Sequence, residues 1–139
     1  MKNGKDIHIE IREGFFAGDH TNIVPVRKDD SGRSYEEKTD DRISICCYYL
    51  EGYLESLLNK YYSKDVQIIN NNSQEGYDEF GWNFYTPEQI ERILGELDEY
   101  TKAQKDRDNL TDFYIRFINR MNRMLQNMDG FDLILFCGP

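Results

Sequence analysis

The run FDLILF, residues 131–136, is the feature that most constrains how this chain can fold. Ile134 and Phe136 would share one side of an extended segment with a single charged residue, Asp132. This pattern is typical of a β-strand that is buried on both faces. Because a buried strand needs neighbouring strands for its backbone hydrogen bonds, we expect the chain to contain a sheet.

The segments available as partner strands are residues 7–12, 22–26 and 66–69. IHIEIR, residues 7–12, alternates isoleucine with polar residues, as a half-buried strand does. NIVPV, residues 22–26, is predicted to be a short edge strand, because Pro25 cannot donate a hydrogen bond to a central ladder. QIINNNSQEG, residues 67–76, is predicted to be a short extended piece followed by a polar, mobile loop.

Three segments show the spacing of an amphipathic helix. The first spans residues 34–62, and its apolar positions from Ile43 to Tyr61 recur at helical intervals. The second begins at TPEQ, residues 86–89, which combines a hydroxyl cap, a proline at the first helical position and a capping-box glutamine. The third carries apolar residues over 110–128, after a cap at Asp108 or Asn109.

These segments predict an α+β fold: a helix-dominated two-layer domain in which about three main helices pack on a small sheet. An all-helical bundle is the alternative. At 139 residues the chain has nearly the commonest size for one domain, so we expect residues 1–139 to form a single domain.

Cysteine content and hydropathy indicate a cytoplasmic protein. Cys46, Cys47 and Cys137 form no CxxC motif and cannot be paired evenly, which fits a reducing compartment. We expect the adjacent pair Cys46 and Cys47 to be buried packing residues. No apolar run approaches the roughly 20 residues of a membrane span, and the first residues lack the apolar core of a signal peptide. We therefore expect no contact with a membrane. The chain is also expected to be a monomer.

The formal net charge of −9 is unevenly distributed along the chain. Residues 75–99 contain eight acids and one base, and so supply seven of the nine excess negative charges. A field of this sign repels nucleic acid and anionic membranes and attracts basic proteins. Solubility alone is the simpler explanation of an acidic chain.

The sequence has no motif for catalysis or for phosphate binding: GxxxxGK[ST], GxGxxG and GxSxG are all absent. His8 and His20 are the only histidines. Neither a nucleophilic pairing of a histidine with Cys137 nor a metal site built on Asp19 and His20 has local support. We expect no enzymatic activity, no cofactor and no metal. A small hydrolase that uses carboxylates brought together by folding is the least favoured alternative.

Arg116, Arg120 and Arg123 form a stripe on the third predicted helix. Such a stripe can bind phosphate. In an acidic chain, however, we expect these arginines to pair within the molecule, with residues 88–99 or 36–41. Direct binding of nucleic acid is not expected, because the chain lacks the positive field that it requires.

The stretch EGYDEFGWNFYTPEQ, residues 75–89, combines five aromatic residues with acids. Trp82 and Phe84 are assigned to the core, with Phe84 as a hydrophobic staple to Ile90. The other aromatics and the acids, in a glycine-bounded loop, fit the rim of a protein interface, and a loop folded down as a core plug is the alternative. The predicted partner-binding residues are Glu75, Tyr77, Asp78, Glu79, Phe80, Tyr85, Glu88 and Glu91.

In its size, acidity, lack of catalytic motifs and acidic aromatic stretch, the chain resembles the small immunity proteins of bacterial polymorphic toxin and contact-dependent growth inhibition systems. The resemblance is one of type, and no motif identifies a particular immunity family. It implies a stoichiometric, non-catalytic inhibitor that binds a cognate basic toxin domain, often a nuclease. The alternative is an acidic nucleic-acid mimic of the phage-encoded kind, which would bind basic enzymes through distributed carboxylates instead of aromatic anchors.

Overall fold

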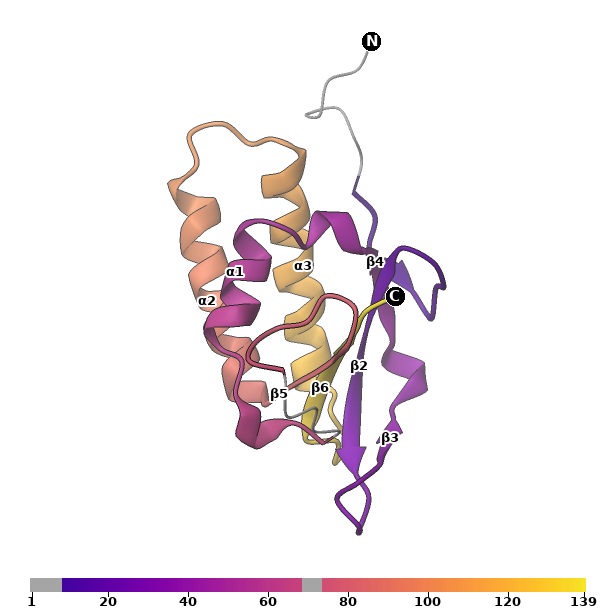
Figure 1. The fold of residues 1–139 in the computed structure, drawn as a ribbon. Helices are drawn as coiled ribbons and strands as arrows, with labels where there is room; N and C mark the ends of the chain where they lie inside the picture. Colours follow the sequence, from indigo (N-terminus) through magenta and orange to yellow (C-terminus); the bar gives the residue numbers. More distant parts are fainter. Residues whose placement is uncertain (1–8, 69–73) are drawn as a thin grey trace.

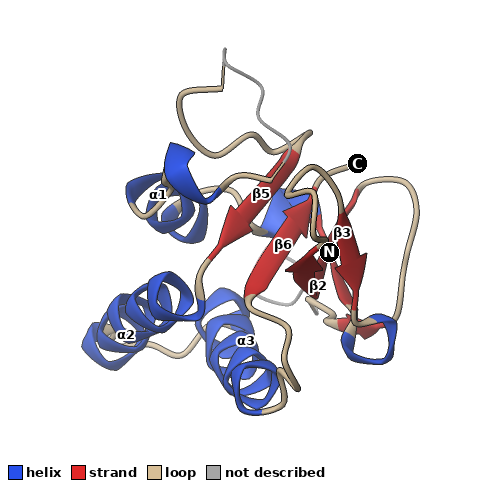
Figure 2. Cartoon of the chain, turned by 90° about the horizontal axis from the view of Figure 1, so that it is seen from below, coloured by secondary structure: helices blue, strands red, loops and turns tan. Residues whose placement is uncertain are grey.

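The computed structural model describes residues 9–68 and 74–139, which form an α+β fold (Figure 1). In these residues, three α-helices lie on the same side of a six-stranded antiparallel sheet (Figure 2). The helices are α1 (Tyr53–Lys60), α2 (Pro87–Ala103) and α3 (Asn109–Gln126). The strands are β1 (Arg12–Glu13), β2 (His20–Lys28), β3 (Tyr35–Glu37), β4 (Ile43–Cys46), β5 (Trp82–Tyr85) and β6 (Leu133–Cys137). Three 3-10 turns are η2 (Thr39–Asp41), η3 (Cys47–Tyr49) and η4 (Lys64–Val66). The α+β prediction is confirmed, and the all-helical alternative is wrong.

β6 lies inside the sheet, as predicted for a strand buried on both faces. The strand order is β1-β4-β2-β6-β5, with β3 also paired to β2. All residues from Leu133 to Phe136 are buried. One partner of β6 was not expected, because β5 pairs with it. Of the strand predicted over residues 66–69, Val66 ends η4, residues 67 and 68 form no strand, and residue 69 lies outside the described residues.

The first predicted strand is much shorter than expected. Within residues 7–12, residues 7 and 8 lie outside the described residues, and strand structure begins only at Arg12, in β1 at the edge of the sheet. Ile9 is nevertheless buried in the core and Ile11 packs against it. Residues 69–73, the centre of the predicted mobile loop, also lie outside the described residues.

Pro25 lies in a central strand, so the prediction of an edge strand is wrong. β2 pairs with β6 on one side and with β4 and β3 on the other. On that second side, pairing with β4 ends at Ile23 and pairing with β3 begins at Val26. The Pro25 carbonyl accepts a hydrogen bond from Lys38 N at 2.9 Å, just after β3. The proline nitrogen therefore faces a break between two partner strands, where no donor is needed.

The prediction of one helix over residues 34–62 is wrong. This segment contains β3, η2, β4 and η3 before α1 begins at Tyr53. Residues 43–45 of β4 are all fully buried, because β4 lies between β1 and β2 in the sheet. Gly52 adopts a φ of +93°, which prevents a helix from continuing through it. The predicted helical core face survives only in α1, at Leu54, Leu57 and Leu58.

The starts of α2 and α3 agree with the prediction. Thr86 Oγ1 accepts a hydrogen bond from Gln89 N at 3.1 Å and Gln89 Oε1 accepts one from Thr86 N at 2.8 Å, which completes a capping box. Asp108 caps α3 by accepting a hydrogen bond from Thr111 N at 2.8 Å. Of the apolar positions predicted for α3, Leu110 is exposed. No helix in the described residues is long and apolar enough to cross a membrane.

The two faces of the sheet are covered by different elements. The helices pack on the face that carries Ile23, Ile43, Ile45, Tyr85, Ile134 and Phe136. The opposite face carries a second cluster of Val24, Val26, Phe84, Leu133 and Leu135. Val66 and Ile68, from the segment after α1, pack on this second cluster near the start of β6. The opposite face is therefore covered at one end.

Gln67 closes the free edge of β5. Its side-chain amide accepts a hydrogen bond from Phe84 N at 2.9 Å and donates one to Phe84 O at 3.1 Å. These two bonds replace those that a neighbouring strand would make. An exposed edge that could pair with another chain is thereby blocked at this position.

Candidate partner-binding surface

Tyr85 is fully buried, so its assignment to a partner-binding rim is wrong. Its hydroxyl donates a hydrogen bond to the Leu58 carbonyl at 2.7 Å. Alternation along β5 explains the placement, because Asn83 and Tyr85 point to the helix-covered face while Trp82 and Phe84 point to the other. Phe84 is buried there, as predicted. Trp82 lies at the uncovered end of that face and is 47% exposed, so its assignment to the core is wrong.

The predicted staple between Phe84 and Ile90 is also wrong. Phe84 belongs to the cluster on the face opposite the helices, whereas Ile90 belongs to the core beneath them. Tyr85 directly precedes the Thr86 cap and shares the helix-side core with Ile90. The residue that occupies the staple position is therefore Tyr85.

The loop before β5 is partly a core plug and partly surface. Tyr77 is half-buried and packs against the helix-side core. Desolvation raises the pKa of its phenol, and the neighbouring Glu55 adds to this effect. Phe80, three residues later, is 67% exposed. Tyr77 thus belongs to a core plug, whereas Phe80 is exposed as a residue of an interface rim would be.

A buried asparagine holds the loop that carries Phe80. Asn83 Oδ1 accepts a hydrogen bond from Asp78 N at 2.8 Å, and Asn83 Nδ2 donates to Asp78 O at 2.8 Å and to Phe136 O at 3.2 Å. The Asp78 carboxylate accepts a hydrogen bond from Phe80 N at 3.0 Å. The exposed ring is therefore carried by a loop whose backbone is fixed to β5 and β6.

The acids predicted to bind a partner do not form one patch. Asp78 is exposed and Glu79 is half-buried in the loop that carries Phe80. Glu75 is exposed and pairs with Lys64 at 2.8 Å. The exposed Glu88 and Glu91 lie on α2, beyond the opposite end of β5. The structure thus brings together the residues of the loop and separates them from the acids of α2.

A second aromatic loop, not identified from the sequence, precedes β2. Phe15 and Phe16 are both exposed. Asn22, which is buried, holds this loop: Phe16 N donates to Asn22 Oδ1 and Asn22 Nδ2 donates to Phe16 O, both at 3.0 Å. The guanidinium of Arg12 lies 4.4 Å from the centre of the Phe16 ring, and that of Arg42 lies 5.8 Å from the Phe15 ring.

The two loops flank the end of β6 (Figure 1). Asn22 and Trp82 are the register partners of Cys137 on its two sides. Gly138 packs directly on the loop before β5, because a Cβ added there would lie 1.9 Å from the Glu79 carbonyl oxygen. A side chain at this position would force the loop and the end of β6 apart.

Tyr48, on η3, lies beside the loop before β2. Its ring is exposed, and the backbone N of its neighbour Cys47 donates a hydrogen bond to Asp19 O at 2.8 Å. Exposed rings from four parts of the chain thus gather around the end of β6. We call them the aromatic surface: Phe15, Phe16, Tyr48, Phe80 and Trp82.

Acidic side chains surround the aromatic surface. Asp19 raises the pKa of the Tyr48 hydroxyl. Desolvation raises the pKa of the Glu55 carboxyl, and Glu79 and Glu51 raise it further. Within residues 9–68 and 74–139, neither Asp19 nor Glu79 forms an ion pair. A cation from another molecule would relieve this crowding of negative charge.

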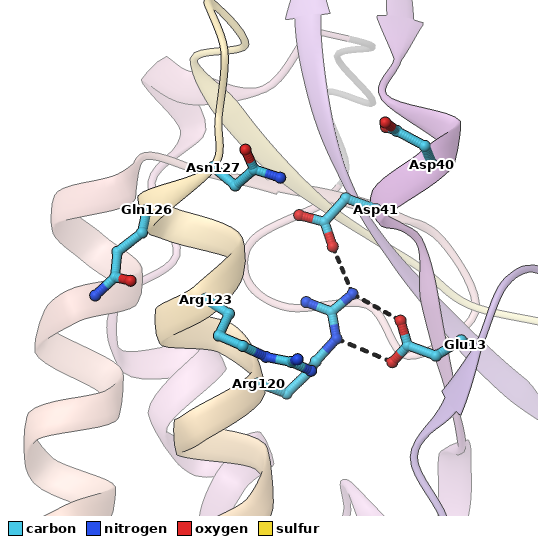
Figure 3. Close-up of a pocket in the computed structure, with 7 residues that line it drawn as sticks. All are labelled: Glu13, Asp40, Asp41, Arg120, Arg123, Gln126 and Asn127. Atoms are coloured by element: carbon cyan, nitrogen blue, oxygen red, sulfur yellow. Dashed lines mark hydrogen bonds and ion pairs between the residues drawn. The ribbon is translucent and has the colours of Figure 1, made fainter.

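A separate pocket of about 530 Å³ contains Arg120 (Figure 3). Arg120 donates hydrogen bonds to both carboxylate oxygens of Glu13 at 3.0 Å and also to Asp41. Arg116 donates to the Ile9 carbonyl at 2.7 Å. Pairing within the molecule is thus confirmed for Arg120 and Asp41. Acids outnumber arginines in the pocket lining, so the arginine stripe offers no net positive charge for an anion there.

The structure places one histidine and one cysteine around a further pocket, also of about 530 Å³, between the loop before β2 and residues 137–139. His20 and Cys137 both line it. Burial raises the pKa of the Cys137 thiol, whereas a nucleophilic cysteine needs a lowered one. Cys46 and Cys47 are half-buried free thiols, so their expected full burial is not observed. In the part of the chain that the structure describes, no three histidine, cysteine or acidic side chains are placed to hold a metal ion.

One signal could have identified the loop before β2 from the sequence. GFFAG, residues 14–18, is an aromatic pair bounded by glycines, like the aromatics of residues 76–82, but it has fewer acids around it. No family model, no curated protein and no solved structure matches this chain.

Proposed function

We propose that this chain is a non-catalytic, protein-binding inhibitor that neutralises a basic toxin domain, as bacterial immunity proteins do. The observation that carries the proposal is the aromatic surface. It exposes five large rings, while most other large apolar side chains of the described residues are buried. Aromatic side chains are favoured anchors of protein interfaces, because they supply a large contact area with few rotatable bonds.

The loops of this surface are fixed before a partner arrives. Asn22 holds the loop of Phe15 and Phe16, and Asn83 holds the loop of Phe80. A binding loop that is already ordered loses less conformational entropy on association. This supports a role in tight, stoichiometric binding.

The charge of the chain supports a basic partner. The net charge is −9, and Asp19 and Glu79 lie beside the exposed rings without forming an ion pair in the described residues. An acidic surface accelerates the approach of a basic protein and repels acidic competitors. A basic nuclease domain has the complementary charge that this surface would attract.

The proposal can be tested by coexpressing the chain with the toxic domain of the protein encoded beside it and measuring bacterial growth. We expect the parent chain to restore growth and the double variant Phe80→Ala/Trp82→Ala to lose this protection. Leu110→Ala is the matched control, because Leu110 is an exposed apolar residue of α3 outside the aromatic surface. No protection by the parent chain would contradict the proposal.

Titration calorimetry with the same toxin domain distinguishes anchoring by aromatics from nucleic-acid mimicry. For anchoring, the double aromatic variant should weaken binding by about 100-fold or more, and Glu79→Lys should weaken it mostly at low salt. For mimicry, each acid removed, including Glu88 and Glu91 on α2, should cause a small and equal loss while the aromatic variants bind as the parent does.

A further inference from the structure

The pocket between the loop before β2 and residues 137–139 adjoins the aromatic surface and has walls that are mainly apolar. Phe15, Phe16 and Ala17 line it on one side, and residues 137–139 line it on the other. Its volume, about 530 Å³, lies within the range of roughly 300–1,000 Å³ that is usual for pockets that bind small ligands. It can therefore accommodate one large side chain.

The walls of this pocket are preformed. Asn22 fixes the backbone of Phe16 by two hydrogen bonds of 3.0 Å. The Phe16 ring also lies 4.6 Å from the His20 ring, centre to centre, and is covered by the Arg12 guanidinium. Across the pocket, Cys137 pairs with Asn22 in the sheet. The wall formed by Phe16 is thus in place before an occupant arrives.

One acid, Asp19, lines the pocket and forms no ion pair within the described residues. The guanidinium of Arg12, which covers Phe16, already pairs with Glu10 at 3.1 Å. Asp19 is therefore available to a cation that the pocket's occupant brings. An apolar pocket with a free carboxylate at its side selects an apolar group next to a positive charge.

On the basis of the proposed function, we propose that this pocket receives one large apolar side chain of the basic partner, flanked by a lysine or arginine that pairs with Asp19. The anchor side chain enters between Phe15 and residues 137–139. Phe80 and Trp82, on the far side of the end of β6, then form the surrounding rim that excludes water from the contact. The recognised feature is thus a short basic segment with a central aromatic or long aliphatic residue.

Blocked tripeptides test this assignment without the toxin. The probes are acetyl-Lys-Trp-Lys-amide, acetyl-Lys-Ala-Lys-amide and acetyl-Glu-Trp-Glu-amide, titrated into isotope-labelled protein and followed by amide NMR shifts. We expect the Lys-Trp-Lys probe to shift the signals of residues 15–20 and 137–138 and to bind about tenfold tighter than either of the other two. The advantage over the Glu-Trp-Glu probe should shrink at high salt.

Two variants and one control locate the binding. Ala17→Trp fills the pocket without changing charge, and Phe15→Ala removes one wall; both residues are exposed, so both variants should fold and give dispersed spectra. Each should weaken the Lys-Trp-Lys probe by about tenfold. Leu110→Ala, on α3 and outside both the pocket lining and the aromatic surface, should leave its affinity unchanged. Shifts confined to other residues, equal affinity for the Lys-Ala-Lys probe, or no effect of either pocket variant would overturn the assignment. Such a result would leave the growth assay to decide the proposed function, because the tripeptide experiment contains no toxin.

Discussion

Replacing Arg120 with methionine should destabilise the fold by about 3–5 kcal/mol, because it removes one partner of a buried ion pair. The side chains of Arg120 and Asp41 are only 8% and 10% exposed. Without the guanidinium, the Asp41 carboxylate would remain buried and would lose the ion pair that Arg120 supplies. Glu13, whose side chain is 66% exposed, should add at most about 1 kcal/mol, because water screens that contact.

The position of Arg120 explains why one residue matters this much. Its guanidinium joins α3 to β1 through Glu13 and to η2 through Asp41 (Figure 3). These three elements are far apart in the chain, and β1 is a strand of only two residues. Methionine keeps most of the apolar stem of arginine, so the substitution tests the charge more than the packing.

Urea denaturation gives the free energy of unfolding for the parent and the variants. Arg123→Met is the matched control: Arg123 is exposed on the same helix and lines the same pocket, so its loss should change stability by no more than about 0.5 kcal/mol. Adding Asp41→Asn to Arg120→Met should restore part of the loss, since a neutral amide is less costly to bury than an unpaired carboxylate. A loss below about 1 kcal/mol in Arg120→Met would refute the buried-pair argument.

Three further substitutions test the fold and the surface. Asn83→Ala should lower stability by about 1–3 kcal/mol, because it removes the hydrogen bonds from a buried side chain to the backbone of Asp78 and Phe136, and a melting temperature equal to that of the parent would contradict this. Leu57→Ala should cost about 2–5 kcal/mol by chemical denaturation through lost burial and a cavity, and a change below about 1 kcal/mol would mean that α1 does not pack as described. Tyr85→Phe should cost about 1–2 kcal/mol near neutral pH, because the Leu58 carbonyl loses its donor. Desolvation raises the pKa of Tyr85 well above its usual 10.0, so the stability contributed by its protonated phenol is fully present below about pH 10 and is lost as the pH rises above that value. Thermal melts near pH 9 and pH 11 should therefore show a larger alkaline loss for the parent than for Tyr85→Phe, and equal losses would contradict the assignment.

Local signals predicted α2 and α3 because the starts of these helices are decided locally, and β6 was predicted from its apolar run. The capping box at Thr86 and the cap at Asp108 use residues within one helical turn. Over residues 43–50 the same reasoning failed, because Ile43, Cys46 and Leu50 fit a helical period while Ile43 and Ile45 also fit the alternation of a strand. Pairing of β4 with β2 decides between them, and this contact joins segments that are not adjacent in sequence.

The aromatic stretch before α2 shows a different limit of sequence reasoning. Trp82 and Phe84 were both assigned to the core and point to the same face of β5, but only Phe84 is buried. Both faces of β5 are covered near Tyr85, by the helices on one side and by Val66 and Ile68 on the other. At Trp82 the second cover is missing. The course of the chain after α1 determines which part of this face is covered. The alternation of residues within β5 does not indicate it.

Asn22 and Asn83 offer a signal that can be used in other sequences. Asn83 lies between aromatic residues in WNFY, and Asn22 directly precedes the apolar residues of NIVPV. A buried amide is costly unless all its groups find partners, so an asparagine inside a strand implies a nearby backbone segment that it binds. Here both asparagines bind loops that expose aromatic rings. Because the asparagines hold the loop backbones, the rings themselves contribute little to folding. Substitution of Phe15 or Phe80 should therefore change binding at nearly constant stability, whereas substitution of Asn22 or Asn83 should lower both.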